Sequence, residues 1–501
     1  MTEQKESYRE VFKATSIFGG VQVFNVLISL IRNKMFTAFW GREGMGMLFM
    51  LQLPLGIIGL ITEMGLGASS IRDITNAKTT GDEIKISRTI KTVRRWVFVT
   101  GIFGMFVVIA LSPLLGYLTD KESNYTWAFL LLSVTLFFSA ISSGQIAVLR
   151  GLRRIKETAK AGLIGSFLGL IFSLPFCYFY GIKGIVPTLI VFSIIGLSTS
   201  WYFSRKVQLP PVIISYKESF SQGKEMIKLG ITFTMTNVTS QLVSYLFNKY
   251  LESQAGMEVV GLYNTGWAIT NQYIALVFTA MAVDYFPRLI SLQSNREKMS
   301  EAVNQQAEIA ILIIAPLMLL FTSFLPIIIR IIYTEEFLPI IAFVQWMILG
   351  MLLKSASWAL SYIIVAKGDN RLFFLSEFIS SMFFILLNIG AYTLFGLKGV
   401  GIAFVIQYTL YFSAMFIIAK KKYQITFKSE FIRLFLFQFI LCLLCFLTVI
   451  IKGYPLTYGI GFLLFLVSAI YSLRKLNEKL DMKDKLLSII RNRKQKKNIS
   501  N

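Results

Sequence analysis

The sequence predicts an all-α integral membrane protein with about fourteen transmembrane helices. Of its 501 residues, 55% are hydrophobic and only 15% are charged, whereas soluble domains carry roughly 25% charged residues. Apolar runs close to the ~20 residues needed to cross a bilayer recur along the chain. We predict spans that begin near residues 14, 44, 96, 125, 159, 182, 226, 257, 308, 338, 371, 399, 431 and 454.

The second observation is an internal repeat, offset by about 215 residues. The segment GIKGI at 181–185 corresponds to GLKGV at 396–400. Because each copy holds six spans, an even number, both copies insert in the same orientation, as in parallel-repeat transporters. Two more spans follow the second copy. Other corresponding positions are Gln22 with Asn237, Ser29 with Ser244, Asn33-Lys34 with Asn248-Lys249, and Gly46 with Gly261.

The repeat and the composition divide the chain into four predicted parts. Two six-helix lobes come first, followed by accessory helices 13 and 14 and then a basic cytoplasmic tail. The boundaries are 1–215, 216–425, 426–474 and 475–501.

Connections between spans carry basic residues on alternate sides of the membrane. The two longest connections are predicted at 72–95 and 204–224, and both are rich in lysine and arginine. The opposite connections are short and carry isolated charges. By the positive-inside rule, both termini face the cytoplasm of a multi-pass protein.

The net charge of +23 does not indicate nucleic-acid binding, because the basic residues follow this alternating pattern. The chain has no histidine and only three cysteines, all within apolar runs, so we expect no metal site and no disulfide framework. Any proton transfer must use carboxylates or lysines.

Polar side chains form matching stripes on the first and seventh predicted spans. Positions four and three residues apart share one face of a helix. Interhelical hydrogen bonding would explain either stripe alone, but their recurrence in both copies favours the lining of a central cavity. The stripe residues are Gln22, Asn25, Ser29 and Asn33, and Asn237, Gln241, Ser244 and Asn248.

Charged residues within the spans are costly and therefore mark candidate sites. At 1.5 Å per residue, Lys354 lies roughly 20 Å and Glu63 about 13 Å from the nearest cytoplasmic basic marker. Arg32, Lys34 and Lys249 lie nearer their helix ends, where the alternative is that they reach the interface with long side chains.

These charges predict a water-filled cavity with net positive character. Lys354, together with Arg32, Lys34 and Lys249, suits an anionic group such as phosphate. Glu63 and Glu377 are candidates for binding a coupling cation, because a desolvated carboxylate gains affinity for a proton.

Short motifs in the first spans resemble a known family. They are IFGG at 17–20, IRNK at 31–34, GMGMLF at 44–49 and GLGASSIR at 65–72, with GLRR at 151–154 further on. The chain resembles the Wzx-type flippases for lipid-linked polysaccharide units such as O-antigen, in the MOP superfamily that includes MurJ and the MATE exporters. The likeness spans the whole membrane domain.

The resemblance implies two lobes that alternate in access across the bacterial inner membrane. It implies a polyprenyl-diphosphate-linked oligosaccharide as substrate, an O-antigen or capsule repeat unit moved to the outer leaflet. It also implies cavity-lining cations in the first helix of each lobe, matched here by Arg32, Lys34 and Lys249. No cofactor is expected beyond H⁺ or Na⁺ coupling; membrane lipids, a polysaccharide polymerase and glycosyltransferases are expected partners.

Two other functions fit the composition less well. A cation-coupled multidrug exporter of the MATE type needs acidic residues for organic cations, and the deep acids here are few and matched by cations. A membrane enzyme such as a polysaccharide polymerase needs a positioned acid/base or metal constellation. The short outer connections and the missing histidines leave little room for one, so we predict a protein that is not an enzyme.

Overall fold

The computed structural model describes residues 2–120 and 125–480, and every element within these ranges is a helix. At some of these positions, Gln22 among them, the side chain lies outside the described residues. The helices are α1 (Thr2–Glu63), α2 (Leu66–Thr79), α3 (Glu83–Thr119), α4 (Thr126–Gly151), α5 (Ile155–Tyr180), η1 (Gly181–Gly184), α6 (Ile185–Arg205), α7 (Tyr216–Ser291), α8 (Arg296–Ile332), η2 (Glu335–Ile340), α9 (Ile341–Ala366), α10 (Asn370–Lys422), α11 (Ser429–Lys452) and α12 (Tyr454–Leu480).

Three of these helices are interrupted at a glycine. Gly41 in α1, Gly256 in α7 and Gly396 in α10 combine a φ of +61°, +78° and +61° with an extended ψ. This conformation is strained for any residue with a Cβ. When each interrupted helix is counted as two and the short α2 is left aside, the described chain has fourteen long helices, which confirms the predicted number.

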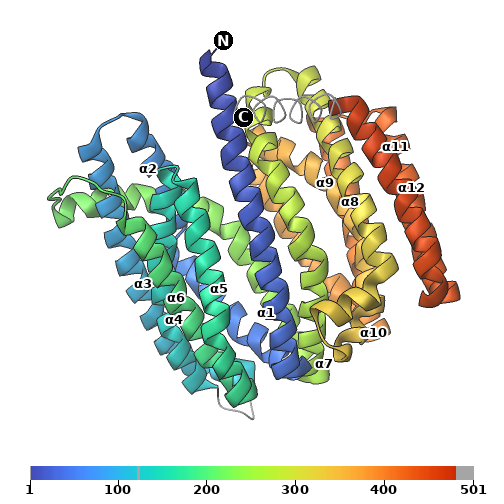
Figure 1. Ribbon diagram of the computed structural model, residues 1–501, viewed down its shortest axis with the longest axis horizontal. Coiled ribbons are helices and arrows are strands. Elements are labelled where there is room, and N and C mark those ends of the chain that lie inside the picture. Colours follow the sequence, from blue (N-terminus) through green and yellow to red (C-terminus); the bar gives the residue numbers. More distant parts are fainter. Residues whose placement is uncertain (1, 121–124, 481–501) are drawn as a thin grey trace, which may run out of the picture. The chain divides into compact units, whose positions relative to one another are not determined.

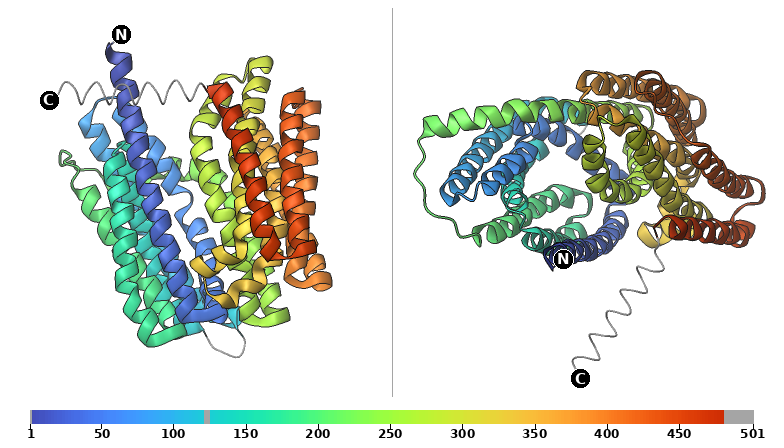
Figure 2. Two further views of the ribbon diagram at one scale, coloured as in Figure 1. Left: turned by 45° about the vertical axis from the view of Figure 1, so that its right-hand side comes forward. Right: turned by 90° about the horizontal axis from the view of Figure 1, so that it is seen from above.

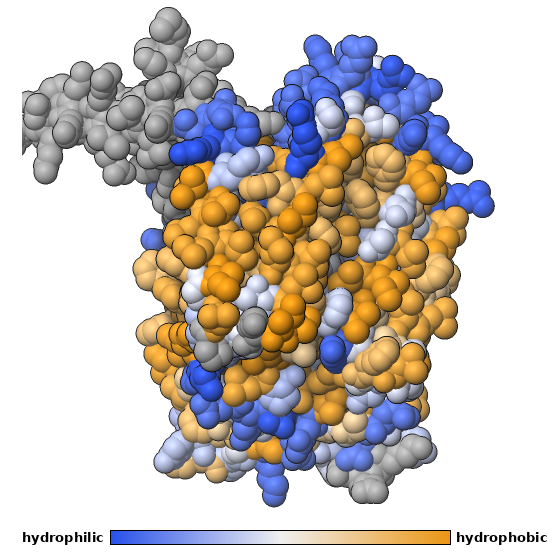
Figure 3. Space-filling model, turned by 90° about the vertical axis from the view of Figure 1, so that its right-hand side faces the viewer, coloured by the Kyte–Doolittle hydropathy of each residue, from blue (hydrophilic) through white to orange (hydrophobic). Residues whose placement is uncertain are grey.

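The helices are apolar enough for a bilayer. Within the described residues, nine continuous helical segments have the length and hydropathy of membrane spans, and three of them (24–63, 155–205 and 370–422) contain two helices each. Figure 3 shows a broad apolar band on one face, with polar residues at both ends. The chain is therefore a multi-pass membrane protein, as predicted.

The internal repeat is present in the backbone. The interruptions at Gly41 and Gly256 lie 215 residues apart. The same offset relates Gly181, which ends α5, to Gly396, which interrupts α10. The same offset carries α4 onto α9 residue for residue at both ends. The positive φ of Arg153 after α4 recurs at Gly368 after α9. The internal repeat in the sequence thus corresponds to a repeated local structure.

The prediction of a long connection at 72–95 is wrong. The chain there forms α2 and the first turns of α3, with the Asp82 side chain capping α3 by accepting hydrogen bonds from the backbone N–H groups of Ile84 and Lys85. Both helices are amphipathic. Their apolar residues, including Ile74, Ile90 and Val93, are buried. The charges on the other face break the apolar run, which is why the sequence pattern alone predicts a connection there.

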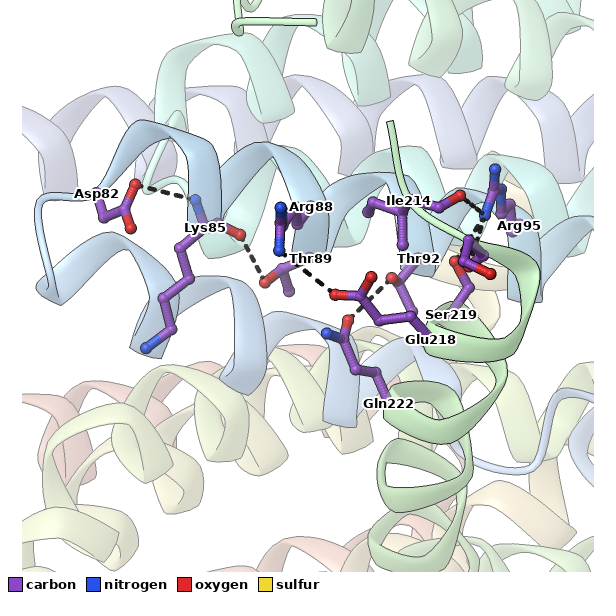
Figure 4. A network of polar contacts seen from close by, with 11 residues as sticks. Asp82, Lys85, Arg88, Thr89, Thr92, Arg95, Ile214, Glu218, Ser219 and Gln222 are labelled. Atoms are coloured by element: carbon purple, nitrogen blue, oxygen red, sulfur yellow. Dashed lines mark hydrogen bonds and ion pairs between the residues drawn. The ribbon is translucent and has the colours of Figure 1, made fainter. Parts of the chain in front are cut away.

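The segment between α6 and α7 runs along α3 and is held there by hydrogen bonds (Figure 4). Ser87, Lys91 and Arg95, one turn apart, donate to the carbonyls of Pro210, Val212 and Ile214 at 2.6, 2.6 and 2.9 Å. Four helical residues rise roughly 6 Å, close to the span of two extended residues. This match fixes the register of the segment. On the next face of α3, Arg88 pairs with Glu218 and Thr92 bonds to Gln222.

The chain forms two compact units. The first holds the chain up to Leu262 together with Ile331–Phe337, and the second holds Tyr263–Arg330 and the chain from Leu338 onward. In the first unit, α3 packs on α4 and α5 packs on α6 (Figure 1). The units are defined by packing, so the predicted domain boundaries at 215, 425 and 474, which follow the repeat and composition, stay predictions.

In the second unit α8 and α9 are mostly buried, and α10 packs against α9 with most of its surface exposed. Helices α11 and α12 lie side by side (Figure 2). Gln438 on α11 joins them by bonding to Ser472 at 3.0 Å and Ser468 at 2.6 Å on α12. Such a buried polar contact fixes the pairing of two apolar helices.

Candidate functional site

The first unit contains a cavity of about 540 Å³. One wall is a single face of α1, where Gln52, Gly56, Gly59 and Glu63 follow one another at helical spacing. Helices α4, α6 and α7 supply the other walls. The remaining lining residues are Leu55, Leu60, Thr135, Leu136, Ser139, Leu189, Phe192, Ser193 and Gln241.

The two glycines keep this wall of the cavity open. A Cβ at Gly56 would lie 2.6 Å from Oε1 of Gln241, so the absent side chain lets the Gln241 amide reach α1. A Cβ at Gly59 would meet no atom within 4 Å, so this position faces open space. The glycine pair therefore lines the cavity with bare backbone between Gln52 and Glu63.

Several polar groups in the cavity are available to a ligand. Among the described residues, the side chains of Gln52, Ser139 and Gln241 form no hydrogen bond, and the Glu63 carboxylate forms neither a hydrogen bond nor an ion pair. Thr135 and Ser193 donate to carbonyls of their own helices at 2.5 and 2.7 Å, which leaves their oxygens able to accept. Amides, hydroxyls and one carboxylate thus face the same space.

Arg32 borders this cavity without lining it. Its guanidinium lies 5.8 Å from the centroid of the Phe192 ring, which is part of the lining, and donates to the Ser29 hydroxyl at 3.4 Å. The cation–π contact stabilises the guanidinium over the ring. No lysine or arginine is among the described residues that line the cavity.

Lys34 and Lys249 make contacts within the first unit. The Lys34 ammonium donates to the backbone carbonyl of Tyr333, in the segment that joins α8 to η2. Lys249 forms an ion pair with Glu252 one turn along α7, and its ammonium lies 3.5 Å from the carbonyl oxygen of Thr119. Their predicted role in binding an anion remains a prediction.

The stripe on α1 is only partly described. Gln22 lies outside the described side chains. The buried Oδ1 of Asn25 has no hydrogen-bond partner among the described residues. Asn33 is partly buried, and its backbone carbonyl accepts from the Thr37 hydroxyl at 2.9 Å. Neither asparagine lines the cavity described above.

The four stripe residues on α7 lie in different surroundings. Gln241 lines the cavity, and Asn237 is exposed. Ser244 is partly buried, and its backbone carbonyl accepts a hydrogen bond at 2.8 Å from the amide of Asn248, which is fully buried. The last member of the stripe therefore packs inside the first unit.

Lys354 lies in a polar cluster of the second unit, on α9. Its ammonium donates to Oδ1 of Asn271 at 2.6 Å and lies 5.3 Å from the centroid of the Tyr408 ring. Glu377 on α10 attracts it electrostatically and accepts a hydrogen bond from the Tyr411 hydroxyl at 2.5 Å. The structure thus brings together Lys354 and Glu377, which the sequence had assigned to separate roles.

Sequence reasoning found Glu63 and Gln241 of the cavity but missed Gln52, Ser139 and Ser193. The signal for Gln52 was present, because Gln52, Gly56, Gly59 and Glu63 repeat at helical spacing. Ser139 and Ser193 follow apolar runs without a distinctive polar pattern, and only the packing of α4 and α6 places them at the cavity. Among the described residues, no group of three or more acidic residues and cysteines has the arrangement of a metal site.

The fold is similar to that of solved transporter structures. It matches the lipid II flippase MurJ in an inward closed conformation with a TM-score of 0.70 and 16% identity, covering 92% of this chain and 99% of that one. It matches the inward-facing conformation of a multidrug resistance MATE family transporter with a TM-score of 0.67 and 14% identity, over 80% and 94% of the two chains. The chain has the fold of the MOP superfamily, as the sequence motifs predicted.

The sequence places the chain more narrowly. It belongs to the family described as polysaccharide biosynthesis protein, whose profile matches residues 41–342, more than half of the chain. Proteins of Escherichia coli (strain K12) and Shigella flexneri, each named lipid III flippase, are 21% identical over 399 residues, which cover 77% of this chain and 92% of the relative. These relatives are transporters, in agreement with the prediction that the protein is not an enzyme.

Proposed function

We propose that this protein is a flippase for a polyprenyl-diphosphate-linked oligosaccharide. The observation that carries the proposal is the family match together with relatives named lipid III flippase that align along 92% of their length. The MOP fold supports it, because two similar halves are the architecture of alternating-access transporters. The substrate moves from the cytoplasmic to the outer leaflet of the inner membrane, with both termini of the protein in the cytoplasm.

The finer assignment is an O-antigen or capsule repeat unit. The glycan is built by glycosyltransferases at the cytoplasmic face and joined by a polymerase at the outer face, and these enzymes are the expected partners. Membrane lipids surround the apolar band and hold the polyprenyl chain.

The anionic head group engages Arg32, Lys34, Lys249 and Lys354, while the polar stripes of α1 and α7 line its path. Arginine and lysine suit phosphate oxygens. The position of Arg32 over the Phe192 ring supports this assignment in the first unit, because a diphosphate beside the ring lies within reach of the guanidinium.

Glu63 and Glu377 are the proposed sites of coupling to H⁺ or Na⁺. Glu63 faces a cavity, and Glu377 lies in the cluster of Lys354. A carboxylate that exchanges a proton or sodium ion in such surroundings alters the charge balance of its own unit.

The test is glycan export in cells that lack their own flippase. Arg32→Ala and Lys354→Ala each abolish export while the protein remains in the membrane at wild-type amounts. Lys183→Ala, which removes an exposed lysine in η1, serves as the matched control and exports normally. Unchanged export in both site variants contradicts the assignment of the head-group residues.

One observation favours a second candidate, a cation-coupled multidrug exporter. The cavity of the first unit carries one carboxylate, and no lysine or arginine is found among the described residues of its lining. An acidic cavity attracts organic cations. A resistance assay with cationic dyes separates the two functions, because a flippase gives no resistance and an exporter restores no surface glycan.

A further inference from the structure

The cavity of the first unit has the wrong chemistry for a diphosphate. Among the described lining residues the only formal charge is that of Glu63, which repels phosphate. The polar groups that face the space are two amides, three hydroxyls and this carboxylate. Amides donate and accept, and carboxylates accept, so together they match a ligand with many hydroxyl groups.

We infer that this cavity binds the sugar portion of the lipid-linked substrate, with Gln52, Ser139, Gln241 and Glu63 as its hydrogen-bonding residues. The inference rests on the proposed function and deepens it, because it separates the sugar site from the head-group site. None of the predicted head-group cations is among the described residues that line the cavity. Four polar side chains that have no partner among the described residues do line it.

The dimensions fit a ligand of this class. A cavity of about 540 Å³ lies within the range of roughly 300–1,000 Å³ that small-molecule sites occupy. Gln52 and Glu63 stand at the two ends of one helix face, roughly 16 Å apart along the axis. Between them the backbone at Gly59 faces open space, so a sugar ring reaches α1 there, beside the Gln241 amide that packs on Gly56.

Phe192 belongs to both proposed sites. It lines the cavity, and the Arg32 guanidinium lies over its ring, 5.8 Å from the centroid. The apolar face of a sugar ring packs on an aromatic ring, whereas a phosphate needs the cation. The ring therefore marks the boundary between sugar recognition and head-group recognition.

Glu63 sets the kind of sugar. Its carboxylate has no ion-pair partner among the described residues, so it accepts hydrogen bonds from sugar hydroxyls. A uronic acid or a phosphorylated sugar brings a second negative charge into the same cavity, where it repels the Glu63 carboxylate. The cavity accordingly selects neutral sugars and rejects acidic ones.

Gly59→Leu tests the site with little risk to folding. The substitution adds a side chain whose Cβ meets no atom within 4 Å and which extends into the cavity, and leucine favours the helix more than glycine does. Gly162→Leu on α5 is the matched control, because a Cβ there also meets nothing within 4 Å and the position does not line the cavity. Gln52→Ala, Gln241→Ala and Glu63→Gln complete the set.

The measurement is equilibrium binding to the full-length protein in lipid nanodiscs. The probes are polyprenyl diphosphate without sugar, the same lipid with a neutral trisaccharide, and the same lipid with a trisaccharide that contains a uronic acid. The wild type and Gly162→Leu bind the neutral glycolipid most tightly. Gly59→Leu loses about tenfold in affinity for it, as does removal of both glutamines, while binding of the bare lipid is unchanged. Glu63→Gln gains affinity for the acidic glycolipid.

Equal affinity of the wild type for all three lipids overturns the sugar site but leaves the proposed function standing. The same holds if Gly59→Leu keeps the preference for the neutral glycolipid. If the wild type binds none of the three lipids and instead binds tetraphenylphosphonium in a manner that Gly59→Leu abolishes, both the sugar site and the proposed flippase function fall.

Discussion

Gly46 and Gly261, separated by 215 residues, lie against each other backbone to backbone. A Cβ built on Gly46 would stand 3.1 Å from the nitrogen of Gly261, and one on Gly261 would stand 2.9 Å from the nitrogen of Gly46. Each Cβ would also collide with a carbonyl four residues before the partner glycine, at Met257 and Arg42. The contact is reciprocal, like the interface of a two-fold symmetric dimer.

This reciprocity predicts that a methyl group is harmful at either position. Gly46→Ala or Gly261→Ala forces the helices of the first unit apart and costs about 1–3 kcal/mol of stability. Thermal unfolding of the purified protein in detergent measures the loss. Gly162→Ala is the control, since its Cβ meets nothing. Equal melting temperatures for all three variants would contradict the close contact.

The glycine interruptions predict a purely conformational cost. At Gly396, with φ +61°, and at Gly390, within regular helix of α10, a Cβ meets no atom within 4 Å. Gly396→Ala therefore destabilises the protein by about 1 kcal/mol through backbone strain alone. Gly390→Ala instead stabilises by roughly 0.5–1 kcal/mol, because alanine favours the helix. Shifts of the same sign in thermal unfolding speak against the backbone conformation at Gly396.

We predict that Lys354 and Glu377 are coupled in their contributions to stability. Glu377 attracts the Lys354 ammonium electrostatically, so removing one of these opposite charges leaves the other uncompensated, which costs more than removing both. Lys354→Met and Glu377→Gln each lower the unfolding temperature, and the double variant is more stable than the sum of the single effects predicts. A double-mutant cycle measured by thermal unfolding gives the coupling. Strict additivity means that the two groups do not interact.

We predict that Asp369, between α9 and α10, makes the stability of the folded protein depend on pH. The hydrogen bond from the Tyr423 hydroxyl lowers the pKa of the Asp369 carboxyl, helped by Lys422 at 3.2 Å. A carboxyl with a lowered pKa stabilises the folded state above its ordinary pKa, and this contribution disappears as the pH falls through the lowered value. The carboxylate is about a third exposed, so the effect is only about 0.5 kcal/mol.

Asp369→Asn therefore lowers the stability at pH 7 and matches the wild type at a pH below the lowered pKa. Unfolding curves of both proteins at several pH values check this. A difference that persists unchanged in acid would assign the effect to packing of the side chain.

The fold was largely predictable, because burial in lipid imposes long apolar runs and the repeat doubles the signal. GIKGI at 181–185 and GLKGV at 396–400 correctly located the same break in both halves. The 72–95 segment was misread, since its amphipathic helices bury only one face. A sliding search for apolar residues does not detect such a helix.

The site was less predictable for a physical reason. Predicted depth in the membrane singles out Glu63 and Lys354 as unusual charges, and their roles in binding stay predictions. Their surroundings depend on which helices pack together, and one sequence does not specify this. Thus Glu63 faces a cavity without basic residues in its described lining, whereas Lys354 bonds to Asn271 in the second unit. The single cationic cavity expected from the sequence is not what the described lining contains.

Translocation in proteoliposomes tests the central claim most directly. A fluorescent polyprenyl-diphosphate oligosaccharide is placed in both leaflets, and a membrane-impermeant reagent quenches the outer one. If the protein is a flippase, lipid from the inner leaflet becomes accessible in vesicles that contain the wild type and stays protected in those with Arg32→Ala or Gly59→Leu. Protection in wild-type vesicles equal to that in empty vesicles, under every imposed H⁺ or Na⁺ gradient, would contradict the account.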